Sequence, residues 1–237
     1  MPEWSPDGKW LAYVRLQTPS VTGYDFDLGS GEIVILPYNG GQLGPAVTVV
    51  PAQAGKEIHF FPSWSPDSQW LVFNTLTCGN GPCQTYNASQ TRLRLVRAIG
   101  DDGQPTAPAD PAPVGAQRPV PLELLTGAHQ PGQTTNWPKF SPFLQGSGLT
   151  FIVYSAKYSW GLQSGGTPQL FFFGVDLKKA REGNGVDPSY APIWLPFQDQ
   201  GTANHSAIWT TDVVCNQQSD CPSEFSCSGG VCAPVLG

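Results

Sequence analysis

The stretch Pro2-Glu-Trp-Ser-Pro-Asp-Gly-Lys-Trp-Leu-Ala-Tyr-Val14 decides the fold of this chain, because it is repeated. A second copy reads Phe61-Pro-Ser-Trp-Ser-Pro-Asp-Ser-Gln-Trp-Leu-Val-Phe73. A third, more divergent copy runs Asn136-Trp-Pro-Lys-Phe-Ser-Pro142 and continues as Gly148-Leu-Thr-Phe-Ile-Val-Tyr154. Repetition at long, roughly regular spacing indicates an array of similar supersecondary units.

Each copy combines an aromatic anchor, a proline-led turn and a short strand. The anchors Trp4, Trp64 and Phe140 precede Ser-Pro, where proline fixes φ and starts a reversal. Asp-Gly or Asp-Ser then completes the turn, and a run of β-branched and aromatic residues follows, as in a strand buried on both faces. The motif residues to which we assign a structural role are Trp4, Pro6, Asp7, Gly8, Trp64, Pro66, Asp67, Trp137, Phe140 and Pro142.

Two further strands are expected after each copy. The first set covers residues 32–38, 92–97 and 169–175, and the second, shorter set covers 47–50, 120–125 and 193–195. Helix signals are nearly absent, and only residues 177–182 offer one or two turns. The sequence therefore predicts an all-β protein of about three four-stranded antiparallel sheets, at about 1–45, 46–126 and 127–210.

The repeat resembles the TolB-like, six-bladed β-propeller family, whose signature is a Trp-Ser-Pro-Asp-Gly turn before a blade strand. The match is close in the first copy, and Ser68 replaces glycine in the second. In the third copy Phe143 stands in place of aspartate, and residues 145–148 lengthen the turn. The resemblance covers about residues 1–210, and it implies blades that bind proteins or ligands on one face.

The spacing of the repeats predicts an incomplete ring. Trp4, Trp64 and Trp137 are separated by 60 and 73 residues, above the roughly 40–50 of a propeller blade. About three blades then fit, whereas closed propellers have roughly four to eight. We expect the missing blades from an N-terminal half outside this chain or from self-association with a second copy. The expected binding partner is a protein or this missing half.

Six cysteines in two groups indicate disulfides and an oxidising compartment. Cys78 and Cys83 are expected to staple a loop tip. Residues 211–237 are too short for a core of their own and are expected to form a cysteine-rich tail, like those appended to secreted bacterial proteins. Its cysteines are Cys215, Cys221, Cys227 and Cys232. Four cysteines allow three pairings; we expect first with third and second with fourth, with a zinc site as the alternative.

The composition of the chain excludes some classes of protein. Only 13% of residues are charged and the net charge is −6, which argues against a nucleic-acid partner, and no apolar run is long enough to span a membrane. The repeat follows Met1 directly, so no signal peptide is seen. Disulfides without a signal peptide predict a mature segment or fragment of an exported protein.

No catalytic signature and no cofactor motif stands out in the sequence. It contains no Gly-x-Ser-x-Gly elbow, no His-Glu-x-x-His and no glycine-rich phosphate loop. We therefore expect a non-enzymatic, exported module that binds a protein or another ligand, without cofactor or metal. Two alternatives remain open, namely an accessory propeller separated from a hydrolase or peptidase, and a structural surface or filament subunit that uses open sheet edges.

Overall fold

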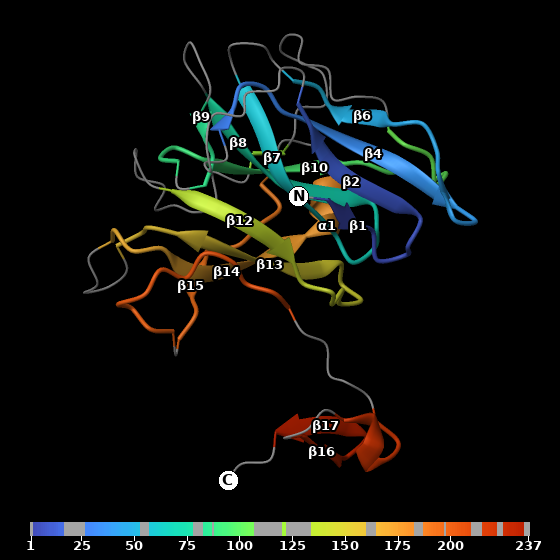
Figure 1. Ribbon diagram of the computed structural model, residues 1–237, viewed down its shortest axis with the longest axis vertical. Coiled ribbons are helices and arrows are strands. Elements are labelled where there is room, and N and C mark those ends of the chain that lie inside the picture. Colours follow the sequence, from blue (N-terminus) through green and yellow to red (C-terminus); the bar gives the residue numbers. More distant parts are fainter. Residues whose placement is uncertain are drawn as a thin grey trace. The chain divides into compact units, whose positions relative to one another are not determined.

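The computed structural model describes residues 2–16, 27–52, 57–77, 83–86, 88–106, 120–121, 134–159, 165–182, 187–196, 198–209, 215–221 and 225–234. The expected Cys78 staple and most of the expected strand 120–125 lie outside these residues. The contacts divide the chain into two compact units, Met1–Ala207 and Ile208–Gly237. In the described residues, three larger antiparallel sheets and one two-stranded sheet form the first unit, and the second contains a disulfide-linked hairpin (Figure 1).

The three sheets follow one another along the chain, as the repeat predicts. The first sheet contains β1 (Glu3–Trp4), β2 (Trp10–Arg15), β4 (Glu32–Asn39), β5 (Gln42–Leu43) and β6 (Val47–Val50). The second contains β7 (Glu57–Trp64), β8 (Trp70–Thr77), β10 (Arg92–Arg97) and β11 (Val120–Pro121). The third contains β12 (Thr135–Phe140), β13 (Leu149–Ala156), β14 (Gln169–Asp176) and β15 (Ile193–Trp194).

Each sheet is built in chain order, with its motif-bearing strand at one edge. The orders are β1-β2-β4, β7-β8-β10-β11 and β12-β13-β14-β15, and the described strands of these sheets pair antiparallel. The first sheet extends to Val50, beyond the expected boundary near residue 45, because β6 pairs with β4. Such simple meanders need only local pairing between consecutive strands.

Smaller elements complete the described chain. The short helix α1 (Leu177–Glu182) follows β14, in agreement with the single expected helical segment. Two loop strands, β3 (Asp27–Leu28) and β9 (Cys83–Gln84), pair with each other and so connect the first and second sheets. In the second unit, β16 (Phe225–Ser228) pairs with β17 (Val231–Pro234), and a 3-10 helix covers Gln218–Asp220.

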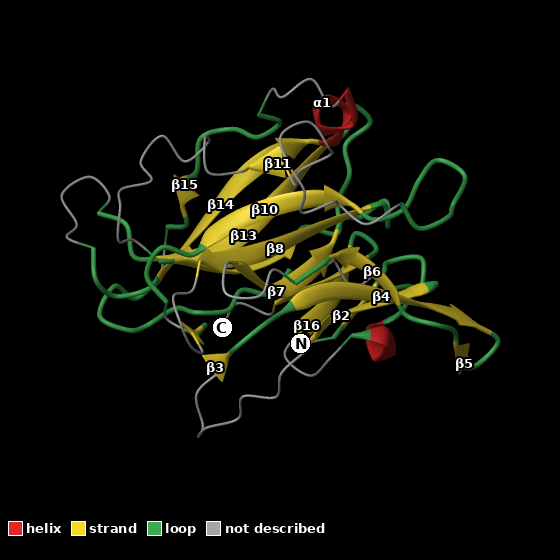
Figure 2. Cartoon of the chain, turned by 90° about the horizontal axis from the view of Figure 1, so that it is seen from above, coloured by secondary structure: helices red, strands yellow, loops and turns green. Residues whose placement is uncertain are grey.

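The sheets pack face to face in chain order, and their apolar side chains form the core. One cluster joins the first and second sheets, including Ile33, Ile35, Leu71 and Phe73. Another joins the second and third sheets through side chains such as Val72 and those of β13 and β14. Seen from above in Figure 2, β13 and β14 of the third sheet overlap β8 and β10 of the second, and β2 and β4 of the first sheet lie near β7. The middle sheet is therefore covered on both faces, which explains its nearly continuous apolar sequence.

Candidate functional site

The two best-conserved copies of the repeat form the same hydrogen-bonded turn. In the first, Ser5 Oγ donates to Asp7 at 2.6 Å and accepts from the Trp10 N–H at 2.9 Å. In the second, Ser65 makes the equivalent bonds to Asp67 and Trp70. The aspartates therefore shape the turn, since each also accepts from the backbone N–H two residues on.

The turns of the first two sheets also bind one another. Asp7 donates its backbone N–H to Ser68 Oγ at 3.1 Å. Burial raises the pKa of Asp7, but the hydrogen bonds from Ser5 and Lys9 outweigh burial, and the pKa lies below its usual value. Ser68 takes the place of Gly8 and shares its left-handed backbone, with φ of 58° against 71°.

The third copy forms its turn differently. Phe143 replaces the aspartate and donates its N–H to Ser141 Oγ at 3.1 Å. A second reversal follows, in which the Gly148 N–H donates to the Gln145 carbonyl at 2.8 Å. Gly148 has φ of 91°, so glycine keeps its role in a lengthened turn.

The residue between proline and the motif aromatic forms a polar centre that the sequence analysis did not single out. This position holds Glu3, Ser63 and Lys139 in the three copies. Ser63 Oγ donates to Glu3 at 2.7 Å, and Lys139 Nζ forms an ion pair with the other carboxylate oxygen of Glu3. The first strands of all three sheets therefore meet at Glu3. The signal in the sequence is the position itself, since each residue follows the proline of Pro-x-aromatic-Ser-Pro.

Phe61 and Trp137, the residues immediately before the motif prolines Pro62 and Pro138, share a strained backbone conformation. Their φ angles are 52° and 59°, and both lie at a register shift in the strand pairing. Their rings stack at 4.0 Å between centroids. Trp137 is thus the counterpart of Phe61 and not of Trp64, so the equivalent anchors Trp64 and Phe140 are 76 residues apart instead of the expected 73.

The motif aromatics differ in exposure although they occupy equivalent positions. Trp64 is 3% exposed and packs with the side chains of the first sheet, and Phe140 is 7% exposed and packs with those of the second. Each therefore covers the sheet that precedes it in the chain. Trp4 is 49% exposed. Trp4 pairs with Leu11, so the two side chains lie on the same face of the sheet. The next residue, Ala12, lies on the opposite face and packs toward the second sheet. Trp4 therefore lies on the face that points away from the second sheet.

Trp4 belongs to an exposed apolar patch that we call the first-sheet face, defined by Trp4, Tyr38 and Leu43. The rings of Trp4 and Tyr38 meet edge to face at 5.1 Å. Tyr38 pairs with Leu43 in the sheet, and both side chains are exposed. Exposed clusters of large apolar side chains are typical of interaction surfaces.

The outer side of the third sheet carries a second patch, which we call the third-sheet face, defined by Phe151, Phe172, Tyr190 and Ile193. Phe151 and Phe172 are partly buried, with ring centroids 6.1 Å apart, and Ile193 pairs with Phe172. Tyr190 and Ile193 are exposed. Phe151 on β13 and Phe172 on β14 alternate with the residues of these strands that pack on the second sheet.

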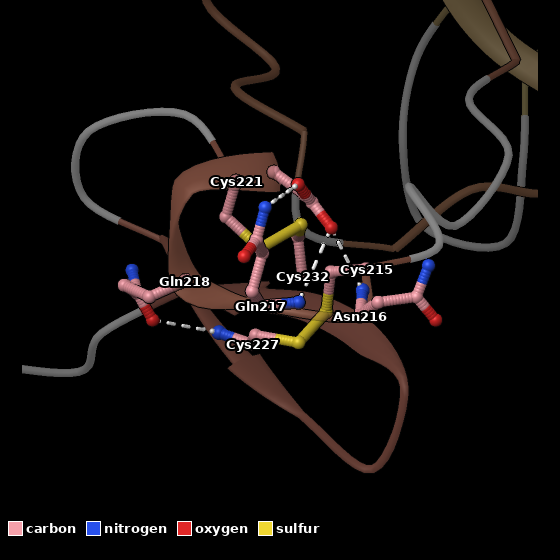
Figure 3. The surroundings of a disulfide bond; sticks show 8 residues. Cys215, Asn216, Gln217, Gln218, Cys221, Cys227 and Cys232 are labelled. Carbon is pink, nitrogen blue, oxygen red and sulfur yellow. Dashed lines mark hydrogen bonds between the residues drawn. A yellow bond between two sulfur atoms is a disulfide. The ribbon is translucent and has the colours of Figure 1, made fainter.

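The tail cysteines form the expected pairs. Cys215 is bonded to Cys227 and Cys221 to Cys232, and the two bridges lie side by side (Figure 3). The Sγ atoms of Cys215, Cys221 and Cys232 lie within 4.8 Å of one another. The two bridges use all four sulfurs, in agreement with the expected disulfides. Cys83 is also disulfide-bonded.

Comparisons with models of known protein families and with curated proteins gave no match. In the part of the chain that the structure describes, no helix has the length and apolarity needed to cross a membrane.

Proposed function

We propose that this chain is an exported, non-enzymatic binding module, built from three TolB-like propeller blades, that docks a protein against its first-sheet face. The exposure of Trp4 carries this proposal. Its counterparts Trp64 and Phe140 are almost completely buried by a neighbouring sheet, so the same position in the first sheet is suited to contact with another protein.

Three further observations support the proposal. The first strands of the three sheets meet at Glu3, as the inner strands of propeller blades would around an axis. Each sheet is a meander that begins with its motif strand. The disulfides of the tail fit an oxidising, extracytoplasmic compartment.

Affinity capture tests the proposed function. The tagged protein is incubated with the exported fraction of the producing cells, beside Leu43→Asp and, as a matched control, Ile208→Asp. Ile208 is exposed but belongs to the second unit. Any protein retained is then purified and its Kd measured by calorimetry. We expect Leu43→Asp to weaken binding at least tenfold and Ile208→Asp to leave it unchanged; equal affinity for both variants contradicts the proposal.

A further inference from the structure

We propose that the protein docked on the first-sheet face is a second copy of this chain, which places its third-sheet face there to form a closed ring of six sheets. This inference rests on the proposed function and names its partner. It follows from a packing arrangement that occurs twice inside the described chain. At the two ends of the stack, this arrangement leaves one exposed motif aromatic and one apolar sheet face without a neighbouring sheet.

The first internal interface shows the rule. Trp64 of the second sheet packs on the first sheet, and its indole Nε1 donates to the Glu3 carbonyl at 3.2 Å. The Glu3 carboxylate in turn accepts from the Trp64 backbone N–H at 3.2 Å. A motif aromatic thus covers the preceding sheet, while the residue after the motif proline points to the following one.

The second internal interface repeats these contacts. Phe140 of the third sheet packs with Trp70, Val72, Leu93 and Leu95 of the second sheet. Its backbone N–H donates to Ser63 Oγ at 3.1 Å, as the Trp64 N–H donates to Glu3. Two different pairs of sheets therefore use one geometry. In the third sheet the equivalent position is Lys139, whose ammonium can donate but not accept a hydrogen bond. A further sheet can therefore repeat the apolar part of this geometry, with Lys139 as a donor in place of the acceptor.

The surfaces at the two ends of the stack are the two halves of such an interface. Trp4 is a motif aromatic with an exposed ring, and it lies on the outer face of the first sheet. The third-sheet face is an apolar sheet surface of the type that Trp64 and Phe140 cover in the interior. Because one chain carries both halves, two copies can satisfy each other at two identical interfaces related by a twofold axis.

The charges of the polar centre are complementary between the two ends of the stack. Going from the first sheet to the third, the position holds an anionic Glu3, a neutral Ser63 and a cationic Lys139. In a ring of two copies, Lys139 of one chain stands next to Glu3 of the other, so opposite charges meet at each new interface. Burial lowers the pKa of Lys139, which makes a second nearby carboxylate favourable to its charged form.

The number of sheets is also compatible with closure. Three sheets per copy give six in the pair, within the roughly four to eight of closed propellers. Closure would bury Trp4, Tyr38, Tyr190 and Ile193 together, and would cover the exposed apolar faces at the two ends of the stack.

The mass in solution tests the inference directly. Light scattering after size exclusion of the full chain should give twice the 25.4 kDa of one copy. Trp4→Asp should give a single copy because it alters the first-sheet face, and Ile193→Asp because it alters the third-sheet face. Ile208→Asp, the same change at an exposed isoleucine of the second unit, should leave the pair intact. Circular dichroism and thermal unfolding confirm that each variant is folded.

Mixing the two variants tests whether the two faces bind each other. Trp4→Asp retains an intact third-sheet face and Ile193→Asp an intact first-sheet face, so the mixture should form a weaker mixed pair through one remaining interface. A wild-type protein of single-copy mass overturns the inference, as does a pair insensitive to both substitutions or a ladder of larger species. If the single-copy protein still captures a different protein through Leu43, the proposed function stands while the second copy is excluded.

Discussion

Lys139 of the third sheet forms an ion pair with Glu3 of the first, although the two residues are 136 positions apart in the chain. Glu3 also accepts from Ser63 and from the Trp64 N–H of the second sheet. One partly buried carboxylate thus receives donors from both other sheets. We expect it to be the main polar contact that holds the three first strands together.

Replacing this carboxylate should destabilise the fold. Glu3→Gln removes the charge that compensates Lys139 and weakens the acceptor for Ser63, so the free energy of unfolding should fall by about 1–3 kcal/mol. Urea unfolding monitored by tryptophan fluorescence measures the change. The control is Lys9→Met, because Lys9 is highly exposed and lies 3.7 Å from Asp7; it should alter stability by less than about 0.5 kcal/mol. Equal effects of the two substitutions would contradict the assignment.

The two motif tryptophans should respond differently to the same substitution. Trp64→Ala opens a cavity between the first and second sheets and should cost about 3–5 kcal/mol. Trp4→Ala removes an exposed ring and should cost at most about 1 kcal/mol in the isolated chain. Denaturant unfolding at low protein concentration, where copies do not associate, gives both values. Similar losses would mean that Trp4 is buried in solution.

The first turn should depend on the backbone of Gly8. Its φ is 71° and a Cβ would meet nothing within 4 Å, so Gly8→Ala should cost about 1–2 kcal/mol from conformation alone. Gly146→Ala is the matched control, since a Cβ there also meets nothing and its φ lies outside the left-handed region. We expect no loss for this control, and a slight gain from the restricted unfolded chain. Thermal unfolding of both variants decides the point.

Acid should destabilise the interface between the first and second sheets through His59. Burial, assisted by the charge of Arg94, lowers the pKa of this histidine from 6.5 to about 4. The unfolded chain therefore binds more protons between these values, and stability falls as the pH drops from about 6.5 to about 4. The contribution of His59 to this loss should reach about 3 kcal/mol.

The contribution of His59 is isolated by comparing urea midpoints of the wild type and His59→Gln at pH 7 and pH 4. Carboxylates titrate in both proteins, so the difference between them reports the histidine. The variant should lose less stability than the wild type on acidification. Parallel losses would show that His59 is protonated in the folded protein at acidic pH.

Local sequence was sufficient to predict the sheets and turns. Ser5 and Asp7 form their turn with bonds to neighbours two to five residues away, so proline, aspartate and glycine at fixed spacing carry the information. The same holds for the apolar runs of β8 and β13, which pair with the neighbouring strands of their own sheets. The tail pairing agreed with expectation, but spacing alone left three possibilities.

Tertiary structure decided the polar centre and the interaction surfaces. Glu3, Ser63 and Lys139 have no common chemistry, and they meet only because equivalent strand positions of stacked sheets converge in space. Trp4 and Trp64 occupy the same position in nearly identical sequences, and packing alone buries one and exposes the other. Local hydrogen bonds along the chain therefore specify the turn and the strand. The burial of a motif side chain depends instead on which sheet lies against it. That neighbour is set by contacts between residues about 60 or more positions apart.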